Sequence, residues 1–114
     1  GLYAITDAIN ASGLKDGEYI FAKNKIVKQN NSVKIKKDNT LAGSIITMNQ
    51  TFINLIKMNF SIEEAVELTS YNASRYLNLS NIGVIENECK SNFLVLDKDY
   101  NLKDVYLDGN KINE

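Results

Sequence analysis

The chain has 114 residues and a formal net charge of −1, and 44% of its residues are hydrophobic and 24% charged. This composition is typical of a folded soluble domain, or a piece of one, and it disfavours an intrinsically disordered chain. Because there is no basic patch and no apolar run near the ~20 residues that span a bilayer, neither a nucleic-acid partner nor a membrane is expected.

The sequence contains no histidine and a single cysteine, Cys89. Histidine is the commonest metal ligand and general base, so a reaction centre complete within this chain would have to use carboxylates or lysines. Cys89 has neither a disulfide partner nor a histidine to activate it, which indicates an inert thiol in a reducing, cytoplasmic environment. The chain does not begin with methionine. These features favour part of a larger protein over a complete enzyme.

The first predicted element is a short, buried, apolar strand over residues 3–6, which ends at Asp7. A loop over residues 10–17 follows, because this stretch holds glycines and other turn formers. Three apolar runs then predict a group of β-strands, with turns in the asparagine-containing stretches between them, since asparagine tolerates positive φ. These runs are residues 19–22, 26–27 and 33–36.

Helical spacing begins after the next loop. Apolar side chains from Ile45 to Met58 repeat as one face of a helix, and Ser44 is placed to cap it. Ser61 and Glu64 have the spacing of a capping box, which predicts a second helix through about Thr69.

Asn72 is predicted to cap a short third helix over residues 73–77. The tail then returns to strands, expected at residues 82–85, 93–96 and 105–107, with a turn at 108–110 before residues 111–112. The order of elements indicates an α/β protein. The first strand fits poorly, because a lone buried strand needs neighbours that the rest of the chain does not provide.

Three motifs follow one another along these elements: Ile5-Thr6-Asp7-Ala8, Thr40-Leu41-Ala42-Gly43-Ser44, and the helical stretch from Thr69 to Leu77. In this order, and with the tail from Ile82 to Gly109, they resemble the C-terminal third of N-acetylglucosamine-6-phosphate deacetylases, members of the amidohydrolase superfamily. The pairing of Thr-Asp-Ala with Leu-Ala-Gly-Ser is what points to the deacetylases.

The resemblance implies an α/β fold that is the C-terminal fragment of a metal-dependent (β/α)8 barrel hydrolase, joined to strands of a small β-sandwich. Residues 1–80 would form the last barrel strand and outer helices, with a β-hairpin insertion near residues 18–37, and residues 81–114 would belong to the sandwich. The first strand would then have its neighbours elsewhere in the barrel. Asp7 would lie at the carboxyl end of a barrel strand, where such enzymes keep their chemistry.

The resemblance also implies a reaction: hydrolysis of N-acetylglucosamine 6-phosphate to glucosamine 6-phosphate and acetate in amino sugar catabolism. Asp7 would be the general acid/base, and Leu41, Ala42 and Gly43 would line the substrate pocket. A divalent metal ion, zinc or iron, would be bound by a glutamate and two histidines that this chain lacks, so no metal ligand is assigned here. The complete enzyme would be a homo-oligomer, a dimer, and this chain alone is expected to be inactive.

Two alternatives remain open at this stage. The chain could belong to another amidohydrolase, dihydroorotase-like or adenine-deaminase-like, since these share the strand-end aspartate. It could also be a stand-alone, non-catalytic binding module. At the level of single residues, Asp7 also suits a turn, the 41–43 segment suits an ordinary loop, and Asn72 and Arg75 are interpreted as packing and capping residues.

Overall fold

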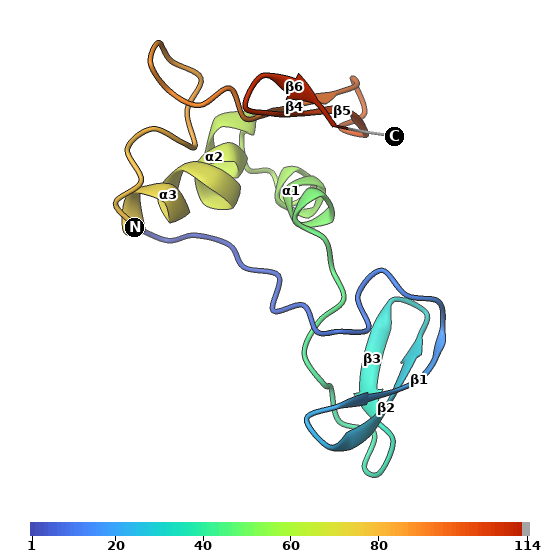
Figure 1. Ribbon diagram of the computed structural model, residues 1–114. Helices are drawn as coiled ribbons and strands as arrows, with labels where there is room; N and C mark the ends of the chain where they lie inside the picture. Colours follow the sequence, from blue (N-terminus) through green and yellow to red (C-terminus); the bar gives the residue numbers. More distant parts are fainter. Residues whose placement is uncertain (113–114) are drawn as a thin grey trace. The chain divides into compact units, whose positions relative to one another are not determined.

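Two small antiparallel sheets and a group of helices make up residues 1–112, the part of the chain that this computed structural model describes (Figure 1). The elements, in chain order, are β1 (Gly17–Phe21), β2 (Asn24–Gln29), β3 (Ser32–Ile35), α1 (Met48–Lys57), α2 (Ile62–Val66), the π-helical turn η1 (Glu67–Tyr71), α3 (Asn72–Tyr76), β4 (Phe93–Leu96), β5 (Leu102–Leu107) and β6 (Asn110–Lys111). The prediction of an α/β chain is confirmed. The last two residues of the predicted 81–114 segment lie outside the described residues.

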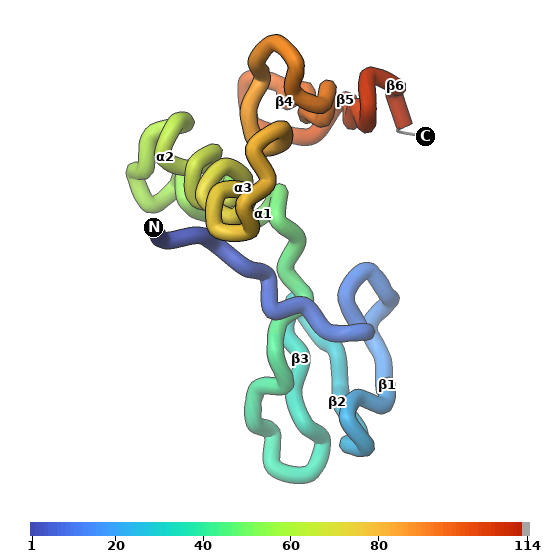
Figure 2. The backbone as a smooth tube through the Cα atoms, turned by 60° about the vertical axis from the view of Figure 1, so that its left-hand side comes forward, coloured from blue at the N-terminus to red at the C-terminus, as the bar shows by residue number. Residues whose placement is uncertain are grey.

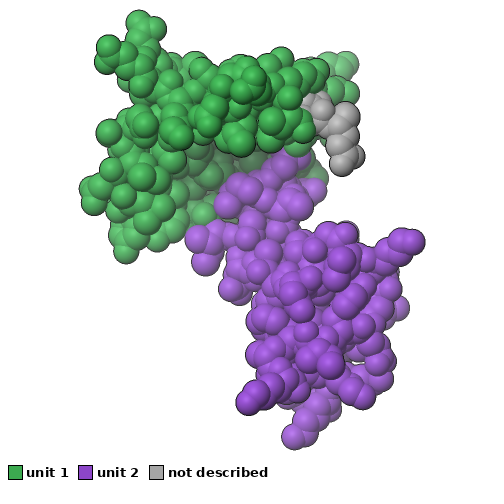
Figure 3. All heavy atoms as spheres, viewed as in Figure 1, with its two compact units in different colours: residues 1–4, 52–114 green, residues 5–51 purple. Residues whose placement is uncertain are grey.

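The chain divides into two compact units, one formed by Ile5–Thr51 and the other by Gly1–Ala4 with Phe52–Glu114 (Figure 3). The first unit contains the sheet β1-β2-β3, and the second contains the sheet β4-β5-β6. No helix within residues 1–112 is both long enough and apolar enough to cross a membrane.

The core of the Ile5–Thr51 unit lies on one face of its sheet. Ile26 and Val33 are almost completely buried, and Ala11 and Ala42 pack with them. Tyr19 of β1 pairs opposite Ile26, so both side chains point to this face. Ile20, the next residue along β1, points to the other face and is 66% exposed.

Both hairpins of this sheet turn on two successive residues with positive φ, the geometry that suits the twist of paired strands. Asn30 and Asn31 have φ values of 49° and 60°, which confirms the predicted asparagine turn. The first turn uses Ala22 and Lys23 instead, although these residues favour positive φ less. A one-residue shift in register would turn Ile26 out of the core, so burial of Ile26 outweighs the local preference.

The helix α1 confirms the predicted helical spacing, but it begins later than expected. The backbone N–H of Gln50 donates to Thr47 Oγ1 at 3.1 Å, so Thr47 caps the helix. The hydroxyl of Ser44, which was predicted to be the cap, accepts from the N–H of Ile46 at 3.0 Å in a local turn instead. The prediction of Ser44 as the helix cap is therefore wrong by three residues.

The capping box at the start of α2 is present as predicted. The N–H of Glu64 donates to Ser61 Oγ at 3.1 Å, and the N–H of Ser61 donates to Glu64 Oε2 at 2.8 Å. Two N–H groups that would otherwise lack a helical partner are thereby satisfied.

The predicted break before a third helix does not occur. The segments α2, η1 and α3 follow one another without interruption, and in η1 the N–H of Asn72 donates to the carbonyl of Glu67, five residues back. Thr69 Oγ1 donates to the carbonyl of Ala65 at 2.7 Å within the same stretch. Asn72 is therefore not a cap, because its side chain reaches outside the helix, to the carbonyl of Leu2.

The second sheet confirms the predicted tail strands in part. Phe93 of β4 and Tyr106 of β5 lie opposite each other, and their rings stack with centroids 4.6 Å apart. The strand predicted over residues 82–85 is absent. Gly83, with φ +83°, approaches α3 so closely that an added Cβ would lie 2.5 Å from Ser74 Oγ. This segment is thus a loop packed on a helix, which apolar spacing alone does not distinguish from a strand.

The buried strand predicted over residues 3–6 does not form. Ile5 is 69% exposed, and the N–H of Ala4 donates to the carbonyl of Leu68 rather than to a strand. A strand needs a neighbour to take its backbone hydrogen bonds. In the described chain the nearest β-bridge joins Ala8 to Ser44, beyond the predicted strand.

Replacing Ile26 with alanine should lower the free energy of unfolding by about 2–5 kcal/mol, because the change leaves a cavity in the core. Ile20→Ala removes the same atoms from the exposed face and should change the free energy by less than about 0.5 kcal/mol. Urea denaturation of the 114-residue chain, followed by circular dichroism, measures both. Equal losses would contradict the assignment of the two faces.

The β4–β5 turn should lose stability in acid. Hydrogen bonds from the backbone N–H and then the side-chain amide of Asn101 hold the pKa of Asp97 below its ordinary value, with smaller help from the N–H of Asp99 and the charge of Lys103. A lowered pKa means that the stabilisation is complete above the ordinary aspartate pKa, about 3.9, and is lost as the pH falls through the folded-state pKa.

The ring signals of Tyr106, followed by NMR in an acid titration, report this loss. Asp97→Asn should remove the acid dependence, whereas Asp99→Asn should keep it, because Asp99 contributes its backbone N–H to the turn. An unchanged titration in Asp97→Asn would show that other groups control the turn.

Candidate functional site

Asp7 adopts a backbone conformation that is uncommon for residues other than glycine. Its φ is +50°, and its side chain is exposed. A left-handed conformation costs an L-residue roughly 1–2 kcal/mol, although aspartate tolerates it better than most. Such strain persists only where the surrounding structure enforces it, and it is concentrated at functional sites. Positive φ recurs at turn residues such as Asn30 and Asn31, so the hydrogen bonds and the close neighbours of Asp7, rather than its φ alone, distinguish it.

A short parallel ladder holds Asp7 in place. The N–H of Ser44 donates to the carbonyl of Asp7 at 3.0 Å, and the N–H of Ile9 donates to the carbonyl of Ser44 at 3.0 Å. Ala8 and Ser44 form the parallel bridge between these two bonds. The ladder joins the Asp7 segment to the loop that precedes α1, which is the other predicted part of the site.

Gly43 lies directly against the Asp7 segment. Its φ is +80°, and a Cβ added to it would lie 2.7 Å from Ile9 Cγ2 and 3.3 Å from the carbonyl oxygen of Asp7. The same Cβ would be 3.8 Å from Asp7 Oδ2, so the carboxylate is beside the glycine. Both the conformation and the close approach require glycine here. The structure thus brings together two of the residues that the sequence singled out, Asp7 and Gly43.

Leu41 and Ala42 belong to the same loop, but they bond to β3 instead of to the Asp7 segment. The N–H of Ala42 donates to the carbonyl of Val33 at 3.1 Å, and its methyl group is buried in the core. Leu41 forms a bridge with Lys34 and leaves its side chain 72% exposed. Of the three predicted pocket residues, Leu41 therefore presents an apolar side chain, Gly43 presents backbone, and Ala42 anchors the loop.

The described residues do not fit a metal ion by themselves. Within residues 1–112 no group of three or more His, Cys, Asp or Glu side chains lies close enough together to hold one. The whole sequence contains no histidine. Asp7 supplies a single carboxylate, which is suited to transferring a proton.

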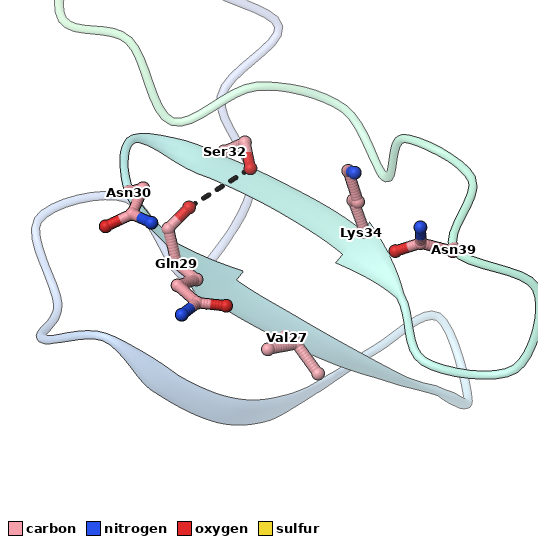
Figure 4. Close-up of a pocket in the computed structure, with 6 residues that line it drawn as sticks. All are labelled: Val27, Gln29, Asn30, Ser32, Lys34 and Asn39. Atoms are coloured by element: carbon pink, nitrogen blue, oxygen red, sulfur yellow. Dashed lines mark hydrogen bonds between the residues drawn. The ribbon is translucent and has the colours of Figure 1, made fainter.

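A concave surface, which the sequence did not reveal, lies on β2, β3 and the turns beside them, away from the Asp7 site (Figure 4). This hollow has a volume of about 240 Å³. Its lining residues are Val27, Gln29, Asn30, Ser32, Lys34 and Asn39. Amides, a hydroxyl and an amine line it, and neither a carboxylate nor a histidine does, so it does not offer the carboxylate chemistry of the Asp7 site.

Comparison with known proteins gives a consistent result over almost the whole chain. The amidohydrolase family model matches residues 4–112. An N-acetylglucosamine-6-phosphate deacetylase from Lysinibacillus sphaericus is 34% identical over 99 residues, which are 86% of this chain and 25% of that protein.

Solved structures of the same kind of enzyme are also similar. The N-acetylglucosamine-6-phosphate deacetylase of Thermotoga maritima matches with a TM-score of 0.92 at 30% identity, covering 99% of this chain and 31% of that one. An aspartate-to-alanine variant of the Mycobacterium smegmatis deacetylase, in complex with N-acetyl-D-glucosamine-6-phosphate, matches with a TM-score of 0.84 at 27% identity. The chain spans between a quarter and a third of the length of these relatives.

Gly43→Ala should destabilise the Ile5–Thr51 unit more than Gly13→Ala does. Both glycines have similar positive φ, +80° and +77°, but an added Cβ meets Ile9 at position 43 and nothing within 4 Å at position 13. Gly13→Ala should therefore cost about 1–2 kcal/mol for the backbone alone, and Gly43→Ala should cost a further 1–3 kcal/mol or so for the overlap.

Thermal denaturation of the 114-residue chain provides the comparison. In the double variant Gly43→Ala/Ile9→Ala, the extra cost at position 43 should shrink, because the overlapping Cγ2 has been removed. Simple additivity in the double variant would show that the overlap is not the cause.

Proposed function

The chain belongs to the amidohydrolase family, and from this premise we propose that it is the part of an N-acetylglucosamine-6-phosphate deacetylase that carries the general acid/base, Asp7. The observation that carries this proposal is the ladder that places a strained, exposed carboxylate beside Gly43. The named function of the matched relatives supports the choice of a deacetylase over a dihydroorotase-like or adenine-deaminase-like enzyme.

Within that enzyme, we assign residues 1–80 to the last strand and outer helices of a (β/α)8 barrel, with the hairpin near residues 18–37 as an insertion. Residues 81–114 are assigned to the small β-sandwich. The exposed apolar side chains of Leu2 and Ile5, at 76% and 69%, support this assignment. Neighbouring barrel strands would cover these side chains and take the hydrogen bonds that an isolated segment cannot make.

Hydrolysis of the acetamide needs two proton transfers: one from the attacking water and one to the departing amine nitrogen. A single carboxylate between these two groups can accept the first proton and donate it in the second step. Asp7 is exposed for this task, and its backbone is fixed at the carbonyl by Ser44. Leu41 would face the acetyl methyl group, and Gly43 would let the backbone approach the sugar. The products are glucosamine 6-phosphate and acetate.

The proposal includes a divalent metal ion, zinc or iron, which polarises the acetyl carbonyl when it is bound. Because the residues of this chain do not form its site, we assign the metal ligands to other parts of the complete protein. For the same reason, the 114 residues alone should not turn over the sugar phosphate. A cytoplasmic homodimer is the assembly that fits the resemblance.

Asp7→Asn in the complete protein should lower kcat for N-acetylglucosamine 6-phosphate by about 10²–10⁴-fold, the usual contribution of general acid–base catalysis. Asparagine keeps the size of the side chain and tolerates the left-handed backbone, so the variant should fold normally. Release of acetate is the measurement, and Asp99→Asn, a change of an exposed carboxylate in the β4–β5 turn, serves as the control.

A variant at Asp7 that kept at least half of the activity would exclude Asp7 as the acid/base. If the unmutated protein hydrolysed dihydroorotate or deaminated adenine, and not the acetylated sugar, one of the other amidohydrolase reactions would replace the deacetylase.

A further inference from the structure

The turn that follows Asp7 contains Ser12, whose side chain continues the ladder by one more hydrogen bond. Ser12 Oγ donates to the carbonyl of Ile45 at 3.2 Å, one residue beyond the carbonyl of Ser44 that accepts from Ile9. Figures 1 and 2 agree that the stretch leading into β1 meets the stretch leading into α1. Three hydrogen bonds therefore join the two stretches here, and of these three only the bond from Ser12 uses a side chain.

The position of Ser12 is fixed from the side of the core. Its N–H donates to the carbonyl of Ile9 at 2.9 Å, which closes the turn. Its neighbour Ala11 is completely buried and packs in the core of the same unit. Because the backbone of Ser12 is held in these two ways, its hydroxyl can hold Ile45 in place. The bond thus links the core to the residues that contact Asp7.

The ladder alone has little reserve against the strain at Asp7. Each of its two backbone hydrogen bonds contributes a net free energy similar in size to the cost of a positive φ. The Ser12 bond adds a third contribution, and because it is partly buried, water replaces the donor only in part when the hydroxyl is removed. Of the three links, the Ser12 bond is also the one that a substitution can remove without changing the backbone.

We propose that Ser12 is a positioning residue for Asp7. It acts by keeping Ser44 in place, and the N–H of Ser44 in turn holds the carbonyl of Asp7. The loop proposed to line the substrate pocket has a separate attachment, because the N–H of Ala42 bonds to Val33. Loss of the Ser12 bond should therefore loosen the acid/base more than it loosens the pocket loop. This inference rests on the function proposed for Asp7.

The test compares Ser12→Ala, Ser12→Thr and Ser32→Ala in the complete protein. Ser32 Oγ also donates to a backbone carbonyl, that of Gln29 at 3.1 Å, in the β2–β3 turn of the same unit, so Ser32→Ala is a matched control. With N-acetylglucosamine 6-phosphate, Ser12→Ala should lower kcat at least about fivefold and leave KM within about twofold, because substrate binds but the acid/base is held less firmly. Ser12→Thr keeps the hydroxyl and should keep kcat within about twofold, as should Ser32→Ala.

The kinetic constants separate positioning from stability. Both alanine variants remove one hydrogen bond and should lower the melting temperature slightly. A positioning role is overturned if Ser12→Ala lowers kcat by less than about fivefold, or if Ser12→Thr loses as much activity as Ser12→Ala. A fall in kcat that Ser32→Ala shares would also overturn it, because the loss would then follow from stability.

Hydrogen exchange in the 114-residue chain tests the link without any assay of deacetylation. The exchange rate of the Ser44 amide, a donor of the ladder, is measured by NMR relative to that of the Ala42 amide, which bonds to β3. Ser12→Ala should raise this ratio about threefold or more, and Ser32→Ala should leave it unchanged. A smaller rise would show that the Ser12 hydroxyl does not support the ladder. If the unmutated complete protein lacks deacetylase activity, the proposed function fails, while the exchange ratio still decides whether Ser12 supports the ladder.

Discussion

The backbone ladder between the Asp7 segment and Ser44 is the interaction on which the candidate site depends. It contributes no side-chain chemistry, since both of its hydrogen bonds join peptide groups. It nevertheless determines which residues can act together, because it brings a carboxylate beside Gly43, far away in the sequence. The two segments approach so closely that a Cβ at position 43 would lie 2.7 Å from Ile9 Cγ2 and 3.3 Å from the carbonyl oxygen of Asp7, which explains why this residue is glycine.

The ladder in turn depends on the small core beneath it. The loop that contains Gly43 continues on its other side into the sheet, where Ala42 bonds to Val33 and buries its methyl group. Val33 packs with Ile26, so the two most deeply buried large side chains of this unit support the backbone that faces Asp7. A cavity in the core would therefore displace the backbone at the site, because the hydrogen-bonded loop connects the two.

The sequence predicts those elements whose causes are local. The capping box at Ser61 and Glu64 and the turn at Asn30 are specified within a few residues, and both are present. The wrong predictions concern residues whose structure depends on a partner far away in the sequence. Within residues 1–112 no strand lies beside the apolar stretch at residues 3–6, and Asn72 bonds to Leu2 instead of capping a helix. The pairing of Asp7 with Gly43 came from the family resemblance, because nothing in the spacing of these residues predicts that they meet.

Two small, opposing free energies explain why the conformation of Asp7 depends on the hydrogen bonds around it. A left-handed φ costs about 1–2 kcal/mol, and each backbone hydrogen bond of the ladder contributes only about 0.5–1.5 kcal/mol net. These terms are of the same size, so the ladder can hold Asp7 in its strained conformation only while both bonds remain intact. The backbone conformation at Asp7 is then held by the hydrogen bonds of the folded unit. The acid/base role proposed for Asp7 needs a backbone that is fixed in this way, because the group must face both a water molecule and an amine nitrogen.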